Sequence, residues 1–226
     1  MKKVVVLTGA GISAESGIKT FRDAGGLWEN HDIMEVASID GWYKNPALVL
    51  EFYNQRRRQL HEVIPNAAHH DLVELESRFE VEVVTQNVDD LHERAGSKRV
   101  LHLHGELFKA RSTADGRLVY EWKKDIVLGD TCERGSQLRP HIVWFGEAVP
   151  MIETAAIKVA SADILIVIGT SLQVYPAAGL LDFVHSKTPV YYIDPKPSLR
   201  SRANLSVIAE NATTGVRKVI EKLMLI

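Results

Sequence analysis

The sequence predicts an α/β fold in which a mainly parallel sheet is covered by helices on both faces. Four short apolar runs carry this prediction, because each ends in small or polar residues and helical stretches separate them. With 226 residues, the chain is long enough for one large domain, or for one domain with a smaller lobe. Because ligands of such sheets bind at the carboxyl ends of the strands, we expect the functional residues there.

Four strands and five helices are expected in chain order. The strands cover residues 3–8, 81–85, 162–168 and 189–193. Apolar residues at every third and fourth position predict helices over 46–63, 67–79, 151–161, 177–185 and 213–223. Ser13 is a candidate for the start of a further helix. Asn45 before Pro46 is typical of a helix start that is capped by a side chain. Residues 17–42 and 109–139 do not fit this alternation, so each is expected to be an inserted lobe or a loop.

The charge balance excludes a general affinity for nucleic acid or for an anionic membrane surface, because 27 Lys and Arg face 29 Asp and Glu. No apolar run approaches the roughly 20 residues of a membrane span. The first residues lead into a strand rather than a signal peptide, so we expect a cytoplasmic protein. We also expect a monomer. The single cysteine, Cys132, cannot form a disulfide within the chain or supply a cysteine-rich zinc site.

A glycine-rich turn follows the first strand. Residues 9–14, Gly-Ala-Gly-Ile-Ser-Ala, match the dinucleotide-binding pattern in its variant with Ala last, where glycines let the backbone approach a pyrophosphate. A hydride-transfer domain needs an acidic residue at the end of a second strand about 20 positions further on. Residues 22–28 supply no such strand end, so a dehydrogenase fits poorly. A tight turn without a ligand is the alternative interpretation.

A second polar cluster follows the strand at 81–85. It contains Thr-Gln-Asn-Val-Asp at 85–89 and, after a short helix, Leu-His-Leu-His-Gly at 101–105. His102 and His104 would share one face of a strand, but without a third ligand they make a poor metal site. A histidine suits general-base chemistry because its pKa lies close to the working pH. From spacing alone, a half-buried polar residue with satisfied hydrogen bonds is the favoured interpretation of either histidine.

The combination resembles the sirtuins, the NAD-dependent protein-lysine deacylases, along nearly the whole chain, and among them the bacterial class III type. The motifs that carry the resemblance are Gly-Ala-Gly-Ile-Ser at 9–13, Gly-Ile-Lys-Thr-Phe-Arg at 17–22, Thr-Gln-Asn-Val-Asp at 85–89, Leu-His-Gly at 103–105, Val-Trp-Phe-Gly-Glu at 143–147 and Gly-Thr-Ser-Leu at 169–172. The resemblance implies one catalytic domain over 1–226, with a Rossmann-like large part at 1–16, 80–104 and 143–226. It also implies a smaller lobe, from insertions at 17–79 (cofactor loop and helices) and 105–142 (a degenerate zinc-ribbon-like part).

The resemblance further implies how NAD is used, since this family consumes NAD and does not employ it as a hydride carrier. His104 would be the general base, and Asn87 would act beside it at the nicotinamide ribose. Gln86 would also hold that ribose, and Asp89 the nicotinamide carboxamide. Other NAD contacts would come from Gly9, Ala10, Gly11, Phe21, Arg22, Trp28, Gly169, Ser171, Asp194, Lys196 and Ala212. The implied substrates are acyl-lysine proteins or peptides, and the products are lysine, nicotinamide and O-acyl-ADP-ribose.

Tyr53 and Arg56 bear on which acyl group is removed from the lysine. They lie three apart in a predicted helix and so project from one face, although spacing alone also fits a packed tyrosine beside a solvated charge run. The pair resembles that of the subclass removing succinyl, malonyl or glutaryl groups, in which a planar guanidinium binds the distal carboxylate. Ala24 resembles the small residue that widens this pocket. The peptide itself would add as a strand along Val143, Phe145 and Gly146. We therefore expect a preference for succinyl or malonyl groups, with acetyl also removed.

The zinc module is where the sequence departs most from the family. Most sirtuins carry two cysteine pairs there, whereas residues 105–140 contain one cysteine, Cys132, and no histidine. Zinc needs about four nitrogen or sulfur ligands, so no structural zinc is expected. Polar and apolar residues alternate over 117–122, which predicts a hairpin strand. Without zinc, an apolar cluster could stabilise the module: Leu118, Val119, Tyr120, Trp122, Ile126, Val127 and Leu128.

Two other functions stay open from the sequence. When nicotinamide leaves NAD, the remaining ADP-ribosyl group could be captured by another nucleophile or by water. The protein would then be an ADP-ribosyltransferase or an NADase. The degraded metal module would instead suit an NAD- or ADP-ribose-sensing module. Lys19 stands where the family commonly has Pro, which predicts a less rigid cofactor loop.

Overall fold

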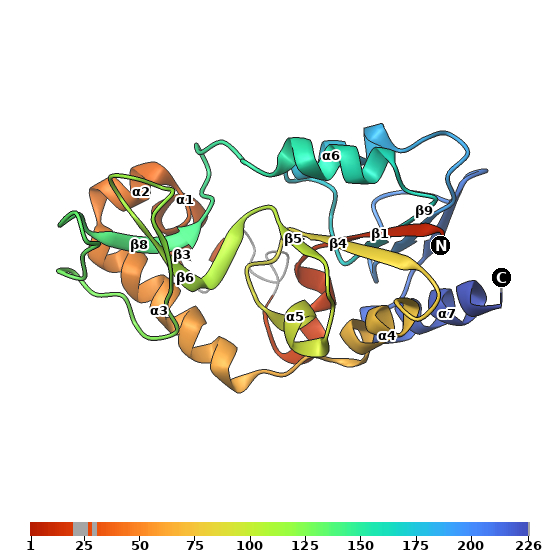
Figure 1. The fold of residues 1–226 in the computed structure, drawn as a ribbon, viewed down its shortest axis with the longest axis horizontal. Coiled ribbons are helices and arrows are strands. Elements are labelled where there is room, and N and C mark those ends of the chain that lie inside the picture. Colours follow the sequence, from red (N-terminus) through yellow and green to blue (C-terminus); the bar gives the residue numbers. More distant parts are fainter. Residues whose placement is uncertain (20–26, 29–30, 226) are drawn as a thin grey trace.

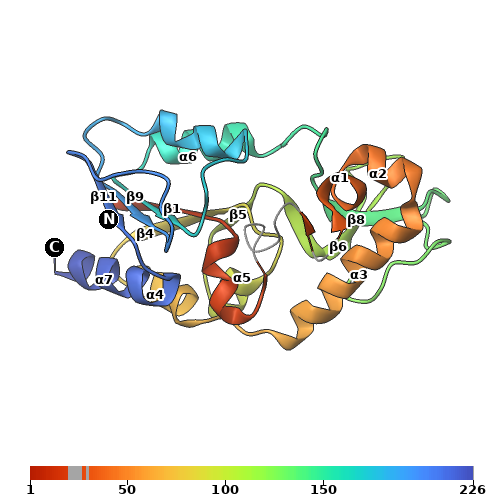
Figure 2. The same cartoon turned by 180° about the vertical axis from the view of Figure 1, so that it is seen from behind.

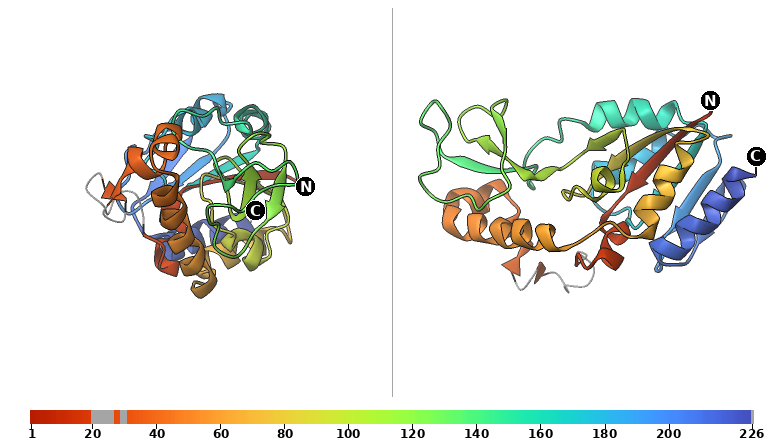
Figure 3. Two further views of the ribbon diagram at one scale, coloured as in Figure 1. Left: turned by 90° about the vertical axis from the view of Figure 1, so that its left-hand side faces the viewer. Right: turned by 60° about the horizontal axis from the view of Figure 1, so that its bottom comes forward.

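The structure, a computed structural model, describes residues 1–19, 27–28 and 31–225, and only the backbone of 27–28. A larger lobe is built on a six-stranded sheet, and a smaller lobe combines helices with a three-stranded sheet (Figure 1). Helix α3 (Pro46–Glu62) and the smaller sheet extend together away from the larger lobe (Figure 2, Figure 3). The predicted α/β fold with a smaller lobe is confirmed.

All strands of the larger sheet run parallel, in the order β11-β10-β9-β1-β4-β5. The four predicted strands are present as β1 (Lys3–Thr8), β4 (Glu80–Thr85), β9 (Ile164–Ile168) and β10 (Val190–Ile193). The edge strands β5 (Val100–His102) and β11 (Leu205–Ile208) were not predicted. The chain runs from β1 to β4 on one side and later to β9 on the other. The carboxyl ends of β1 and β9 are therefore the switch point at which such sheets bind ligands.

Alternate residues of β1 point to opposite faces of the sheet, and each face has its own helices. Val4 and Val6 belong to the core formed with α4 (Ala67–Leu75) and α7 (Ala212–Met224). Val5 and Leu7 belong to the core formed with α6 (Ile152–Ala160) and the 3₁₀ helix η4 (Ala177–Phe183). Helix α4 falls in the range 17–79 that we assigned to the smaller lobe, yet it packs on the sheet beside α7.

The smaller lobe places α3 against the sheet of β6 (Gly105–Ser112), β7 (Val119–Glu121) and β8 (Leu138–Ile142), which pair antiparallel. The short helices α1 (Ile33–Val36) and α2 (Ile39–Lys44) lie beside α3, and β2 (Leu27–Trp28) pairs with β3 (His31–Asp32). A third core lies between these elements; it contains Trp42, Phe52, Tyr53, Ile126 and Trp144. The hairpin strand expected over 117–122 is confirmed by β7.

Three local predictions need correction. No α-helix starts at Ser13, where two 3₁₀ turns stand instead (Ala10–Ile12 and Ala14–Ser16). The carbonyl oxygen of Ser13 accepts from the N–H of Ser16, three residues on, at 3.1 Å, and Gly17 ends the second turn in the left-handed region. The helix expected over 177–185 is also 3₁₀. In the apolar cluster of the smaller lobe only Ile126 is fully buried, and three members are exposed: Val119, Val127 and Leu128.

The short helix α5 (Leu91–Ala95) follows β4 and leads to β5. None of the helices that the structure describes is long and apolar enough to cross a membrane.

Candidate active site

The glycine turns after β1 and β9 touch backbone to backbone. The N–H of Gly11 donates to the carbonyl oxygen of Gly169 at 2.8 Å, and Gly169 has a φ of +60°. A Cβ on Gly11 would lie 2.5 Å from the Cα of Gly169, so neither position accepts a side chain. Ala10 and Ser171 lie in the same two turns. The predicted NAD-contacting turns are thus brought together at the switch point of the sheet.

Ser13 connects two of the predicted site residues at the end of β4. Its hydroxyl accepts from Asn87 Nδ2 (3.1 Å) and donates to Asp89 Oδ2 (3.0 Å). Asp89 also accepts from the N–H of Leu91, and its burial raises the pKa of this carboxyl to about 6. No role was predicted for the Ser13 side chain, although its place inside the glycine motif was a usable signal.

His102 and His104 face the same loop but sit in opposite electrostatic settings. Nδ1 of His104 contacts the carbonyl oxygen of Gln86 at 3.0 Å, and burial lowers the pKa of the ring. Nδ1 of His102 contacts the carbonyl oxygen of Asn87 at 3.0 Å, while its Nε2 lies 2.8 Å from Glu93. Burial alone would lower the pKa of His102, but Glu93 outweighs it and raises this pKa. His104 is therefore suited to act as a neutral base, whereas His102 keeps its proton to a higher pH than an ordinary histidine.

A buried chain of side chains lies behind these residues. Thr8 Oγ1 donates to Thr85 Oγ1 (2.8 Å), which accepts from the N–H of Asn87, while His92 Nε2 lies 3.1 Å from Thr8 Oγ1. Gln86 Nε2 donates to Thr170 Oγ1 at 3.1 Å and so links the ends of β4 and β9. These contacts fix the backbone that presents Asn87.

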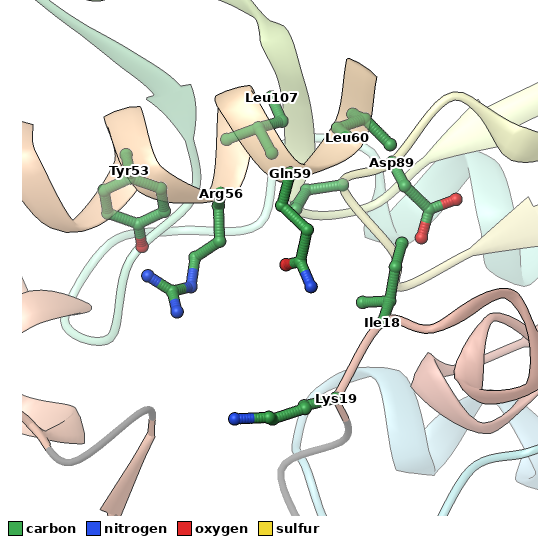
Figure 4. A pocket seen from close by; sticks show the side chains of 9 residues that line it. Ile18, Lys19, Tyr53, Arg56, Gln59, Leu60, Asp89 and Leu107 are labelled. Atoms are coloured by element: carbon green, nitrogen blue, oxygen red, sulfur yellow. The ribbon is translucent and has the colours of Figure 1, made fainter. Parts of the chain in front are cut away.

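A cavity of about 60 Å³ begins at Asp89 and continues along α3 (Figure 4). Tyr53 and Arg56, on adjoining turns of α3, line it together with Asp89. Lys19 also lines it, and Figure 4 shows its side chain pointing into the same space as the guanidinium of Arg56. The remaining walls are mainly apolar: Ile18, Gln59, Leu60, Val88 and Leu107. Lys19 was not predicted to line a pocket.

Tyr53 and Arg56 are both oriented by neighbours. The Nη1 of Arg56 donates to the carbonyl oxygen of Phe52 at 2.7 Å, and its guanidinium lies 3.8 Å from the centre of the Phe52 ring. The hydroxyl of Tyr53 accepts from Trp144 Nε1 at 2.9 Å. Tyr53 is buried, which raises the pKa of its phenol, so the hydroxyl keeps its proton at neutral pH.

The predicted groove strand at 143–147 is only partly regular, since β8 ends at Ile142. Val143 donates to the carbonyl oxygen of His104 (2.9 Å), and Phe145 donates to that of Ala37 (2.9 Å). Gly146 has a φ of +88°, so the chain turns there instead of continuing as a strand. Phe145 is 41% exposed, and it is the member of this segment that presents a large apolar side chain to solvent.

Three other predicted NAD contacts, Asp194, Lys196 and Ala212, lie after β10 and at the start of α7. Asp194 is buried after β10 and accepts from the N–H of Lys196 at 2.8 Å, and Ala212 is buried at the start of α7. Phe21, Arg22 and Ala24 lie outside the described residues, and of Trp28 only the backbone, in β2, is described.

The module at 105–142 offers a poor donor set for zinc. Cys132 is buried and its Sγ lies 3.4 Å from Ser112 Oγ, a hydroxyl and not a metal-binding sulfur or nitrogen. Across the part of the chain that the structure describes, no group of three or more His, Cys, Asp or Glu is placed to hold a metal ion. Instead, the amide of Asn54 on α3 bonds both the N–H and the carbonyl oxygen of Ile126, each at 2.9 Å.

Comparisons with known proteins agree with this geometry. Residues 9–176 match the sequence model of the Sir2 family. The chain is 60% identical over 225 residues to an NAD-dependent protein deacylase of Helicobacter pylori, covering 99% of this chain and 98% of the relative. A Sir2 homologue solved in complex with NAD superposes with a TM-score of 0.88 at 38% identity, over 99% of this chain and 90% of that one. A Sir2 structure with a p53 peptide and NAD⁺ superposes with a TM-score of 0.81 at 33% identity, over 99% and 94%.

Proposed function

The chain belongs to the Sir2 family and is an NAD-dependent protein deacylase, and on that premise we propose that it prefers lysines whose acyl chain ends in a carboxylate. Succinyl-lysine and malonyl-lysine are the substrates of this kind that the pocket suits, and acetyl-lysine is a weaker one. The observation that carries the proposal is the cavity in which Tyr53 and Arg56 share a wall with Asp89. An acyl chain that reaches the catalytic end would there meet a guanidinium fork and a phenol.

We assign the proton transfer to His104. Its Nδ1 is held by the carbonyl oxygen of Gln86, so the neutral ring presents Nε2 as the acceptor. When bound, NAD supplies the ribose that receives the acyl group, and His104 would take the proton from a ribose hydroxyl. Asn87 would hold that ribose through its side chain, which Ser13 orients. Asp89, at the same cavity, would hold the nicotinamide carboxamide.

The acylated peptide would lie along residues 143–146. Backbone hydrogen bonds from Val143 and Phe145 to His104 and Ala37 hold this segment in place. A Sir2 relative has been solved with a p53 peptide together with NAD⁺, which supports a peptide as the second substrate. An extended peptide added beside this segment would direct its acyl-lysine toward the cavity at Asp89.

Mass spectrometry of matched succinyl-lysine and acetyl-lysine peptides, with and without NAD, tests the acyl preference. Arg56→Met should lower kcat/KM for the succinyl peptide by about 10- to 100-fold more than for the acetyl peptide. The matched control is Arg58→Met, because Arg58 is half-exposed and pairs with Glu51 and Asp125 outside the cavity. Equal losses on both peptides in the Arg56 variant would refute the carboxylate preference.

We also propose that the module at 105–142 is stable without metal. The bonds of Asn54 to Ile126, and the buried Arg57 that donates to Asn54 and to the carbonyl oxygen of Leu107, provide an anchor to α3. Elemental analysis of the purified protein should find less than one zinc per ten chains. A chelator should leave its melting temperature unchanged. Stoichiometric zinc, or unfolding by the chelator, would refute this part.

A further inference from the structure

The ring of His102 contacts two different elements at once. Its Nδ1 lies 3.0 Å from the carbonyl oxygen of Asn87, and its Nε2 lies 2.8 Å from Oε1 of Glu93 on α5. The register of β5 beside β4 sets this position, because His102 pairs with Thr85 at the end of β4. The side chain of His102 is 8% exposed, so water competes little for either contact.

Both partners of this ring accept hydrogen bonds. The carbonyl of Asn87 has no proton to give, and the bond and charge of His102 outweigh burial and lower the pKa of Glu93, so its carboxyl is ionised. Only a ring with a proton on each nitrogen satisfies both contacts. A ring with one proton leaves a bare nitrogen facing an oxygen.

The charged groups around the ring favour the second proton. Glu93 and Glu106 both raise the pKa of His102, and together they outweigh burial, while Asp89 and the buried His92 also interact with the ring. At pH 6.5, the ordinary pKa of histidine, more than half of these rings therefore carry both protons.

Asn87 is held through three different groups. Its backbone N–H donates to Thr85 Oγ1 at 3.0 Å, and its side-chain Nδ2 donates to Ser13 Oγ at 3.1 Å. Its carbonyl oxygen is the group that His102 contacts. The contact from His102 therefore fixes the peptide plane that follows Asn87, which neither of the other two bonds controls.

We propose that His102, anchored by Glu93, is a positioning residue that holds the carbonyl of Asn87 so that the Asn87 side chain faces the nicotinamide ribose of NAD. This inference rests on the proposed role of Asn87 at that ribose and extends it to two residues to which the proposed reaction gives no part. It predicts that the contact at Nδ1 matters for NAD, whereas the contact at Nε2 only steadies the ring.

Asn and Gln test the two edges of the ring separately. The amide nitrogen of Asn replaces Nδ1, so His102→Asn keeps the donor toward Asn87. The amide nitrogen of Gln replaces Nε2, so His102→Gln keeps only the donor toward Glu93. At pH 6.5, His102→Gln should lower kcat/KM for NAD about tenfold, and His102→Asn no more than about twofold. KM for the acyl peptide should stay within about twofold in both.

Two further readouts do not depend on turnover. The dissociation constant of NAD, measured by calorimetry, should rise in the Gln variant and not in the Asn variant. The ¹³C resonance of the Asn87 carbonyl in the ligand-free protein should move in the Gln variant alone. Glu106→Gln is the matched control, because Glu106 also faces His102 but its side chain bonds Lys109. It should change kcat/KM for NAD by no more than about twofold.

Equal losses in the two His102 variants, or no loss in His102→Gln, would overturn the inference. If His102→Gln does not fold, 2-fluorohistidine at position 102 alone keeps the ring shape but takes no second proton in this pH range. Glu93 then draws the single proton to Nε2, so the loss should match the one expected for Gln. An unchanged kcat/KM for NAD would again refute the role of His102.

Asn87→Ala separates this inference from the proposed function. If it leaves NAD binding and turnover unchanged, the proposed role of Asn87 is wrong. If it lowers both while His102→Gln lowers neither, only the role of His102 is wrong.

Discussion

Nδ1 of His104 lies 3.0 Å from the backbone oxygen of Gln86. Because a carbonyl oxygen only accepts, the proton of the neutral ring resides on Nδ1, and Nε2 is left as the basic nitrogen. The partner is a backbone atom at the end of β4, so the orientation of the base depends on the sheet and not on a second titratable side chain.

The pH profile should reflect this setting. Burial lowers the pKa of His104 below its ordinary value of 6.5, so the neutral base persists to lower pH. We expect kcat/KM for the succinyl peptide to stay constant from pH 8 down to about 6.5 and to fall only below it. His104→Gln should lose about 10²- to 10⁴-fold in activity. A midpoint above pH 7 in the acid limb would contradict the assignment.

Asp89 should destabilise the folded protein at neutral pH. Its folded pKa, raised by burial to about 6, exceeds the ordinary value of 3.8, so the folded state binds the proton more tightly. Stability is therefore lost as the pH rises through this interval and stays lower above it. Asp89→Asn should raise the free energy of unfolding at pH 8 by about 1–2 kcal/mol, because removing the buried charge outweighs the loss of one hydrogen-bond acceptor. Urea unfolding should show the difference vanishing near pH 4, while deacylation falls. A less stable variant at pH 8 would be inconsistent with this reasoning.

The Glu93–His102 pair should stabilise the protein at low pH rather than high pH. A histidine whose folded pKa is raised contributes stability that is complete below its ordinary pKa of 6.5 and is lost as the pH rises through the folded value. Glu93→Gln should cost about 0.5–1 kcal/mol at pH 6 and less at pH 9; the effect is small because Glu93 is 40% exposed and solvent screens the pair. NMR titration of His102 should show a lower pKa in the variant. An unchanged His102 pKa would argue against the pair.

Asn54 should be decisive for the stability of the module at 105–142. Asn54→Ala leaves the N–H and carbonyl oxygen of Ile126, and the Nη1 of buried Arg57, without their Asn54 partner. We expect a loss of about 3 kcal/mol in the free energy of unfolding. Proteolysis should also cut faster within 113–137. Arg58→Ala, which removes half-exposed ion pairs and a 3.3 Å bond to the backbone oxygen of Asn54, should cost no more than about 0.5 kcal/mol. Equal effects of the two changes would show that Asn54 is not the anchor.

Local signals were enough for much of the fold. The apolar runs predicted β1, β4, β9 and β10 because a strand buried on both faces is mainly apolar; the exception in β4, Glu82, is paired with Lys3 and Lys158. Helix α3 was predicted to within one residue, since Asn45 and Pro46 mark its start and its apolar spacing continues. The 3₁₀ turns at Ser13 were missed because a short apolar pattern does not distinguish i+3 from i+4 backbone bonds.

The amino-acid sequence by itself determined the α/β class, the family and the residue types that can do the chemistry, because strand patterns, glycine turns and short motifs are local properties. Only the tertiary structure decided which of these side chains act on one another. Ser13 joins Asn87 to Asp89, and Trp144 orients Tyr53, through hydrogen bonds between residues 74 to 91 positions apart. Such contacts depend on how strands and lobes pack, and no local periodicity encodes their direction.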